Sequence, residues 1–143
     1  MKKYILQFNQ SISWIFESQK IAKNNPKTTL YEAISKHIIN DKCSLINHGL
    51  LFSACYMYFL LPKEKDVDKI KIDSSLFLEI SNKNDIPRRL RNSIAHGKIK
   101  VLDNGNIVFS DNNQNRSNPF EAKISPINLA KLIEETGKNY AFS

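Results

Sequence analysis

The sequence predicts a single, mainly α-helical domain over residues 1–143, built as a helical bundle with a small antiparallel β-hairpin inserted before the C-terminal helix. Apolar residues recur at steps of three and four along most of the chain, as they do on one face of a helix. After Gly97 the period changes to two, and an Asn-Gly pair separates the two halves of that stretch. A length of 143 residues suits one hydrophobic core.

The N-terminal part predicts two helices. The first covers the apolar positions of residues 5–22 and ends before Pro26, because the residue before a proline disfavours the helical conformation. The second covers residues 30–39 and begins at a threonine that a glutamate three or four positions later can cap in return. The candidates for this cap are Thr28 or Thr29 with Glu32.

The middle of the chain predicts a long helix, a linker and a short helix. The long helix extends from about Cys43 to Leu61 and ends at Pro62. The charged stretch 63–71 is the linker, and residues 74–80 then form the short helix. The apolar run 45–61 contains polar residues and is short for a membrane span, so we expect a buried helix and no membrane segment.

A helix over residues 86–96 follows, with Asp85 as its N-cap, Pro87 in its first turn and Gly97 as its stop. Next comes the hairpin, with strands at 98–102 and 107–110. In the remainder, 111–118 is a loose polar stretch, 120–124 is a candidate third strand, and a final helix begins at Ser125-Pro126.

The charge of the chain is concentrated. There are 21 Lys and Arg against 14 Asp and Glu, a net charge of +7. Residues 81–100 contain six basic side chains and one acidic one, so this segment carries +5 of the total. A solvated basic face is one interpretation, and a phosphate-binding surface is the other. The six basic residues are Lys83, Arg88, Arg89, Arg91, Lys98 and Lys100.

The compartment predicted from the sequence is the cytoplasm. Polar residues interrupt the first ten positions, so a secretory signal is not expected. Cys43 and Cys55 match no metal or redox-motif spacing and are expected to be free, inert thiols. We find no Gly-rich phosphate loop and no metal-ligand spacing, and therefore predict neither a metal site nor a cofactor.

The segment from Arg88 to Gly97 carries a motif of Arg, a polar residue, three further residues and His, filled by Arg91, Asn92 and His96. With this motif the chain resembles the HEPN domains, and the fold that the resemblance implies is a HEPN-like bundle. It further implies a metal-independent ribonuclease in a toxin or phage-defence setting, acting as a homodimer, with an antitoxin protein as a further partner.

The residues of the motif suit cleavage of RNA without a metal ion. A neutral imidazole at His96 can take the proton of a ribose 2′-OH, and a protonated one can donate to the leaving 5′-oxygen. The guanidinium of Arg91 can neutralise charge on the phosphate oxygens, while Asn92 orients either the imidazole or the phosphate. We expect Arg88, Arg89, Lys98 and Lys100 to contact the RNA backbone.

One copy of the helix supplies one imidazole, whereas acid and base steps call for two. Five residues at 100° each place Arg91 and His96 about 140° apart around the helix. A two-fold axis that joins two copies would supply two of each residue in one cleft, which agrees with the homodimer implied by the resemblance.

Alternatives remain open at this point. Arg91 can instead pair with an acidic group, and His96 can cap a helix end. Some HEPN toxins have a Tyr two residues after the motif His, where this chain has Lys98, so regulation by modification of that Tyr is in doubt. Other HEPN members keep the fold without nuclease activity, and a non-catalytic module that binds RNA, a nucleotide or a protein partner is the second hypothesis.

Overall fold

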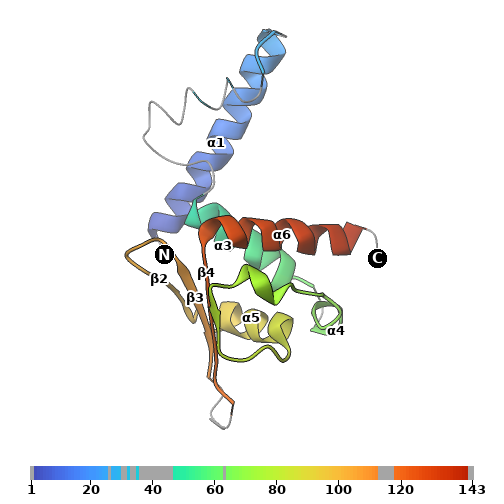
Figure 1. The fold of residues 1–143 in the computed structure, drawn as a ribbon. Helices are drawn as coiled ribbons and strands as arrows, with labels where there is room; N and C mark the ends of the chain where they lie inside the picture. Colours follow the sequence, from blue (N-terminus) through green and yellow to red (C-terminus); the bar gives the residue numbers. More distant parts are fainter. Residues whose placement is uncertain are drawn as a thin grey trace. The chain divides into compact units, whose positions relative to one another are not determined.

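The computed structural model describes residues 2–25, 27–29, 32, 35, 47–62, 64–112 and 118–141 (Figure 1). It divides into two compact units, Met1–Ser53 and Ala54–Ser143. The prediction of one domain over residues 1–143 stays a prediction.

In the first unit, helix α1 (Lys2–Asn24) ends just before Pro26, as predicted. The predicted cap of a second helix is also present. The N–H of Thr29 donates to Glu32 Oε2 at 2.8 Å, and the N–H of Glu32 donates to Thr29 Oγ1 at 3.2 Å. Two donors at a helix start are satisfied reciprocally in this arrangement. Most of the predicted helix over 30–39 lies outside the described residues.

Helix α3 (His48–Cys55) crosses the boundary between the units, and its residues 48–53 belong to the first unit, where Gly49 packs closely on α1. Asn47 connects the two helices, because its Nδ2 donates to Ser11 Oγ of α1 at 2.7 Å and its Oδ1 accepts from the Leu50 N–H at 3.0 Å. A Cβ at Gly49 would collide with the backbone oxygen of Tyr4. Glycine at this position therefore allows the two backbones to approach.

The long helix predicted to end at Pro62 changes its hydrogen bonding midway. A π-helix, η1 (Tyr56–Leu60), follows α3, and the Leu61 N–H donates to the Tyr56 carbonyl five residues earlier at 3.2 Å. The segment ends at Pro62 as predicted. Its predicted start near Cys43 lies outside the described residues.

The second unit contains an antiparallel sheet in the order β1-β4-β3-β2. The strands are β1 (Glu79–Ile80), β2 (Ile99–Val101), β3 (Ile107–Asp111) and β4 (Phe120–Ile124). β2 pairs with β3 around a turn at Gly105, whose φ is 82°. The candidate third strand over 120–124 is β4, so the sheet is larger than the hairpin we predicted.

Two predictions for the stretch between Pro62 and Asp85 are wrong. The expected linker contains a short helix, α4 (Glu64–Val67), because Val67 and Ile70 are buried apolar residues that the charges around them conceal in the sequence. In place of the expected helix over 74–80 there is a 3₁₀ turn, η2 (Ser74–Leu76), followed by β1. Pairing with the open edge of β4 outweighs the local helical pattern.

Two longer helices complete the second unit (Figure 1). α5 (Ile86–Ala95) contacts β3, η1 and α4, and buries Ile86, Leu90 and Ser93. α6 (Pro126–Ala141) begins where Ser125 Oγ accepts from the Asn128 N–H at 3.2 Å. The chain is therefore mainly helical with a small antiparallel sheet, in agreement with the coarse prediction.

Candidate functional site

Helix α5 carries the predicted motif. The residue just before the helix has an unusual backbone conformation. Asp85 occupies the predicted N-cap position, with φ 54° and ψ 37° in the left-handed region. Its carboxylate makes no capping hydrogen bond, contrary to the expected role. A left-handed non-glycine residue costs about 1 kcal/mol or more, although Asp tolerates it better than most.

The C-terminal end of α5 is closed by backbone groups alone. Gly97 has φ 63° and donates its N–H to the Ile94 carbonyl at 3.1 Å, while the Lys98 N–H donates to the Ser93 carbonyl at 2.8 Å. These two bonds form a Schellman motif. Gly97 is thus the predicted stop, and the imidazole of the C-cap residue His96 is not needed to satisfy the last carbonyls of the helix.

Three polar residues share one face of α5. Arg88, Asn92 and His96 are spaced four residues apart, which stacks them along the helix axis. His96 is exposed, and Asn92 is half-buried. Arg91 lies off this stripe, so α5 itself does not place the guanidinium of Arg91 and the imidazole of His96 on one side.

An ion pair joins α5 to a residue that the sequence did not indicate. Asp111, the last residue of β3, is 2% exposed, and its Oδ2 accepts from two side chains of the helix. Arg89 Nη1 donates to it at 3.1 Å and Asn92 Nδ2 donates at 3.2 Å. With a side-chain exposure of 16%, Arg89 is not on a solvated face.

These side chains border a pocket of about 260 Å³, lined by Asp85, Arg88, Arg89, Asn92 and Asp111. The structure therefore brings three of the predicted site residues, Arg88, Arg89 and Asn92, to one pocket. The other four, Arg91, His96, Lys98 and Lys100, are not among its lining residues.

Arg91 is half-buried, and its Nε is fully enclosed. This atom has no hydrogen-bond partner within the part of the chain that the structure describes, and the same part contains no acidic group paired with Arg91. Burying a donor without a partner is unfavourable, so such a group calls for a specific explanation.

Lys98 and Lys100 lie just beyond the helix. Both are exposed, and Lys98 Nζ donates to the backbone oxygen of Asn112 at 3.3 Å. Lys98 directly precedes β2 and Lys100 lies within it. They add positive charge next to the end of α5 that carries His96.

Asp111 is the pocket residue that the sequence analysis does not predict, because it falls at the start of the stretch 111–118 that is expected to be loose. The signal was the alternation along β3, in which Ile107, Phe109 and Asp111 are all buried. A carboxylate that continues an apolar face needs a cationic partner, and the Arg-rich helix directly upstream offers one.

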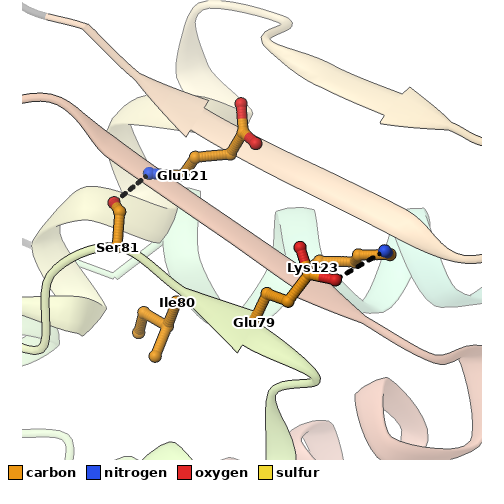
Figure 2. Close-up of a pocket in the computed structure, with 5 residues that line it drawn as sticks. All are labelled: Glu79, Ile80, Ser81, Glu121 and Lys123. Carbon is orange, nitrogen blue, oxygen red and sulfur yellow. Dashed lines mark hydrogen bonds and ion pairs between the residues drawn. The ribbon is translucent and has the colours of Figure 1, made fainter.

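A second hollow of about 240 Å³ lies along β1 and β4, lined by Glu79, Ile80, Ser81, Glu121 and Lys123. Figure 2 shows two of its polar contacts, from the Glu121 N–H to Ser81 Oγ at 2.9 Å and from Lys123 Nζ to Glu79 Oε1 at 2.8 Å. None of these residues was predicted to belong to a site.

Two absences concern the described residues only. They contain no group of three or more His, Cys, Asp or Glu side chains placed to hold a metal ion. None of their helices combines the length and the apolar character that crossing a membrane requires.

A mainly helical chain with an Arg-Asn-x3-His motif on a short helix that runs into an antiparallel hairpin fits the class of HEPN domains. The family model described as HEPN pEK499 p136 matches residues 1–142, and the chain belongs to this family. No curated protein and no solved structure matches it. The resemblance drawn from the motif is confirmed at the level of the family.

Proposed function

We propose that this chain is a metal-independent endoribonuclease that cleaves RNA by attack of a ribose 2′-OH on the adjacent phosphate. The observation that carries the proposal is the exposed imidazole of His96, which lies on the same face of α5 as a polar pocket and is not engaged in closing the helix. Membership of the HEPN family supports the same activity.

In the proposed reaction, the neutral imidazole of His96 takes the proton of the 2′-OH as that oxygen bonds to phosphorus. The bond from phosphorus to the 5′-oxygen breaks, and a protonated imidazole donates to that leaving oxygen. The products are a 2′,3′-cyclic phosphate and a 5′-OH. Arg91 neutralises charge that builds on the phosphate oxygens, and Asn92 assists as a positioned amide.

The proposal places two copies of α5 in one site. The two protonation roles call for two imidazoles, and Arg91 lies off the stripe that carries His96. In a homodimer, the second copy would supply the second imidazole and an Arg91 that faces the His96 of the first copy. The enclosed Nε of Arg91 agrees with a hydrogen-bond acceptor for this atom that comes from outside the described part of the chain. The proposal takes the helices to assemble as a HEPN-type bundle with the hairpin ahead of α6.

Basic side chains around His96 and the pocket bind the RNA in the proposed function. Lys98 and Lys100 provide exposed cations for the RNA backbone next to His96. Arg88 and Arg89 contact RNA through the pocket. A cytoplasmic toxin or phage-defence protein controlled by an antitoxin agrees with the family.

The decisive experiment is cleavage of an end-labelled single-stranded RNA in the presence of EDTA, with analysis of the new ends. We expect a 2′,3′-cyclic phosphate from the unmodified chain and a loss of at least about 100-fold in rate for His96→Ala and for Arg91→Ala. Lys131→Ala removes an exposed charge on α6 and is the control, with no expected change. Cleavage that requires Mg²⁺, or that survives both substitutions, contradicts the proposal.

The alternative is a non-catalytic module that binds RNA, a nucleotide or a protein partner. It is favoured by the contact between Asn92 and Asp111, because an amide held by a buried carboxylate also serves a purely structural purpose. This alternative predicts salt-sensitive RNA binding, or none, with intact RNA recovered after long incubation.

A further inference from the structure

The carboxylate of Asp111 joins the buried end of β3 to the helix that carries the motif. It is 2% exposed, and its Oδ2 accepts from Arg89 Nη1 at 3.1 Å and from Asn92 Nδ2 at 3.2 Å. A carboxylate paired with a guanidinium accepts hydrogen bonds and donates none, so only the Nδ2 end of the Asn92 amide can face it. The buried carboxylate therefore fixes the orientation of that amide and leaves Oδ1 as an acceptor for another group.

The imidazole of His96 can reach this acceptor. The His96 N–H donates to the Asn92 carbonyl at 3.0 Å, so the two residues keep the spacing of one helical turn even at the C-cap. Residues four apart on a helix have Cβ atoms about 5 to 6 Å from each other. A helical side chain also leans toward the turn that precedes it, which for His96 is the turn that carries Asn92.

The end of β3 also contacts the chain just after His96. The Ser110 N–H donates to the Lys98 carbonyl at 3.0 Å. Asp111 is the next residue of the strand, and it holds Asn92. Two neighbouring residues of β3 thus hold the chain on both sides of His96. The position of the imidazole relative to the Asn92 amide is therefore restricted before any substrate binds.

Asp111 also decides between the two roles that the sequence leaves open for Asn92. A phosphate oxygen that accepted from the same Nδ2 would lie close to the Asp111 carboxylate, and two anions at such a distance repel each other. The single charge of Arg89 cannot offset both of them. An imidazole that donates to Oδ1 meets no such repulsion, so the fixed amide favours orienting His96 over binding the phosphate.

We infer that Asp111 is a positioning residue of the proposed ribonuclease, which acts through Asn92 on the imidazole of His96. Asn92 Oδ1 accepts from Nδ1–H of the neutral imidazole, because Nδ1 is the ring nitrogen nearer the helix backbone. Nε2 then carries the lone pair that takes the proton of the ribose 2′-OH. On a protonated imidazole, Nε2–H donates to the leaving 5′-oxygen while Nδ1–H stays bonded to Asn92. The inference rests on the proposed function.

The position of the proton on His96 is measured first, by nitrogen-15 NMR of the unmodified chain without RNA, at a pH where the imidazole is neutral. His96→Gln identifies which of the three histidine signals belongs to His96. We expect the Nδ1–H form to predominate, and to give way to a mixture of the two tautomers in Asp111→Ala and in Asn92→Ala. Asn92→Ala leaves the ion pair of Asp111 intact, so it tests the inference even if Asp111→Ala does not fold.

Arg89→Lys is the matched control for a loss of stability. It keeps a cation beside Asp111 but removes the planar guanidinium, and it leaves the contact between Asp111 and Asn92 in place. We expect a lower free energy of unfolding with the Nδ1–H form retained. An unmodified chain in which Nε2 carries the proton, or a tautomer that is the same in Asn92→Ala as in the unmodified chain, would overturn the inference.

Cleavage rates then test whether Asp111 acts through Asn92. Asp111→Ala should lower kcat at least about 10-fold, as expected when an imidazole loses the group that orients it. KM should change less than about 2-fold, because substrate binding is not affected. In the Asn92→Ala background, Asp111→Ala should have no further effect on kcat. Losses that multiply would show a purely structural role and reject the inference. Retention of the Nδ1–H form in a chain that cleaves no RNA would reject the ribonuclease and leave the contact of His96 with Asn92 in place.

Discussion

Two hollows of similar size in the second unit each contain an ion pair, and the two pairs differ in how far water reaches them. At α5 and β3, about 260 Å³, the ion pair joins Arg89 and Asp111 with side-chain exposures of 16% and 2%. At β1 and β4, about 240 Å³, the pair joins Lys123 and Glu79 with exposures of 27% and 71% (Figure 2). The ion pair of the first hollow is withdrawn from water, although Asp85 and Arg88, which also line it, are exposed, and the ion pair of the second hollow is largely hydrated.

The difference shows why only one of the two is a candidate site. A guanidinium and a carboxylate that are both shielded are costly to separate and hold their neighbours in a fixed geometry. An exposed lysine and glutamate lose side-chain entropy when they pair and are screened by salt. The hollow at α5 is thus organised in advance, whereas the hollow at β1 and β4 reflects the shape of a sheet edge.

The largest expected effect comes from breaking the shielded pair. Asp111→Ala leaves the Arg89 guanidinium without its acceptor and deprives Asn92 of its anchor. We expect the free energy of unfolding to fall by about 3 kcal/mol, the low end for a broken buried pair, because Arg89 keeps some access to water. Urea denaturation followed by circular dichroism measures the change.

Asp111→Asn is the matched control, since it keeps the volume and one acceptor oxygen while removing the charge. It should cost less than Asp111→Ala. A loss below about 1 kcal/mol for Asp111→Ala would place this pair in the same energetic class as surface ion pairs and remove the contrast between the two hollows.

The second expected effect concerns a group that is buried without an ionic partner. Burial raises the pKa of the Cys55 thiol from 9.0 to about 12. Between these values the folded chain keeps a proton that the unfolded chain loses. The stability contributed by the neutral thiol is therefore complete below pH 9 and is lost as the pH rises toward 12, by about 1.4 kcal/mol per pH unit.

Denaturation at pH 8.0 and at pH 10.5 tests this. The unmodified chain should lose about 2 kcal/mol more between the two values than Cys55→Ala does, since other titrating groups are common to both. The cavity that alanine leaves lowers the free energy of unfolding of Cys55→Ala equally at both pH values. It therefore does not affect the loss between pH 8.0 and pH 10.5. Parallel losses in the two chains would show that Cys55 does not stay protonated in the fold.

The sequence predicted those parts of the fold that depend on local chemistry. Pro26, Pro62 and Gly97 end helices where expected, because a missing N–H or a left-handed backbone acts on the nearest turn. β1 and η1 were not predicted. The strand depends on the edge of β4, which is some 40 residues away in sequence, and the change of hydrogen bonding at Tyr56 has no local marker that we recognise.

The candidate site also has a part that follows from local sequence and a part that depends on distant contacts. The charged helix and its motif were visible, since Arg91, Asn92 and His96 lie within six residues. Asp111 was not visible, because its role depends on the register that brings the end of β3 against α5. Extending the alternation of β3 by one residue places the carboxylate of Asp111 on the buried face, where it needs a cationic partner.

The smallest expected effect is the removal of the exposed pair. Glu79→Ala leaves Lys123 in contact with water, so we expect the free energy of unfolding to fall by less than about 1 kcal/mol, and the difference to shrink further in 1 M NaCl as screening increases. Asp111→Ala should keep most of its effect in the same salt, because screening ions do not reach a 2% exposed carboxylate. A loss for Glu79→Ala that equals that of Asp111→Ala and persists in salt would mean that pairing across the edge of the sheet, not burial, sets the strength of these contacts. The pre-organisation assigned to the pocket at α5 would then need another source.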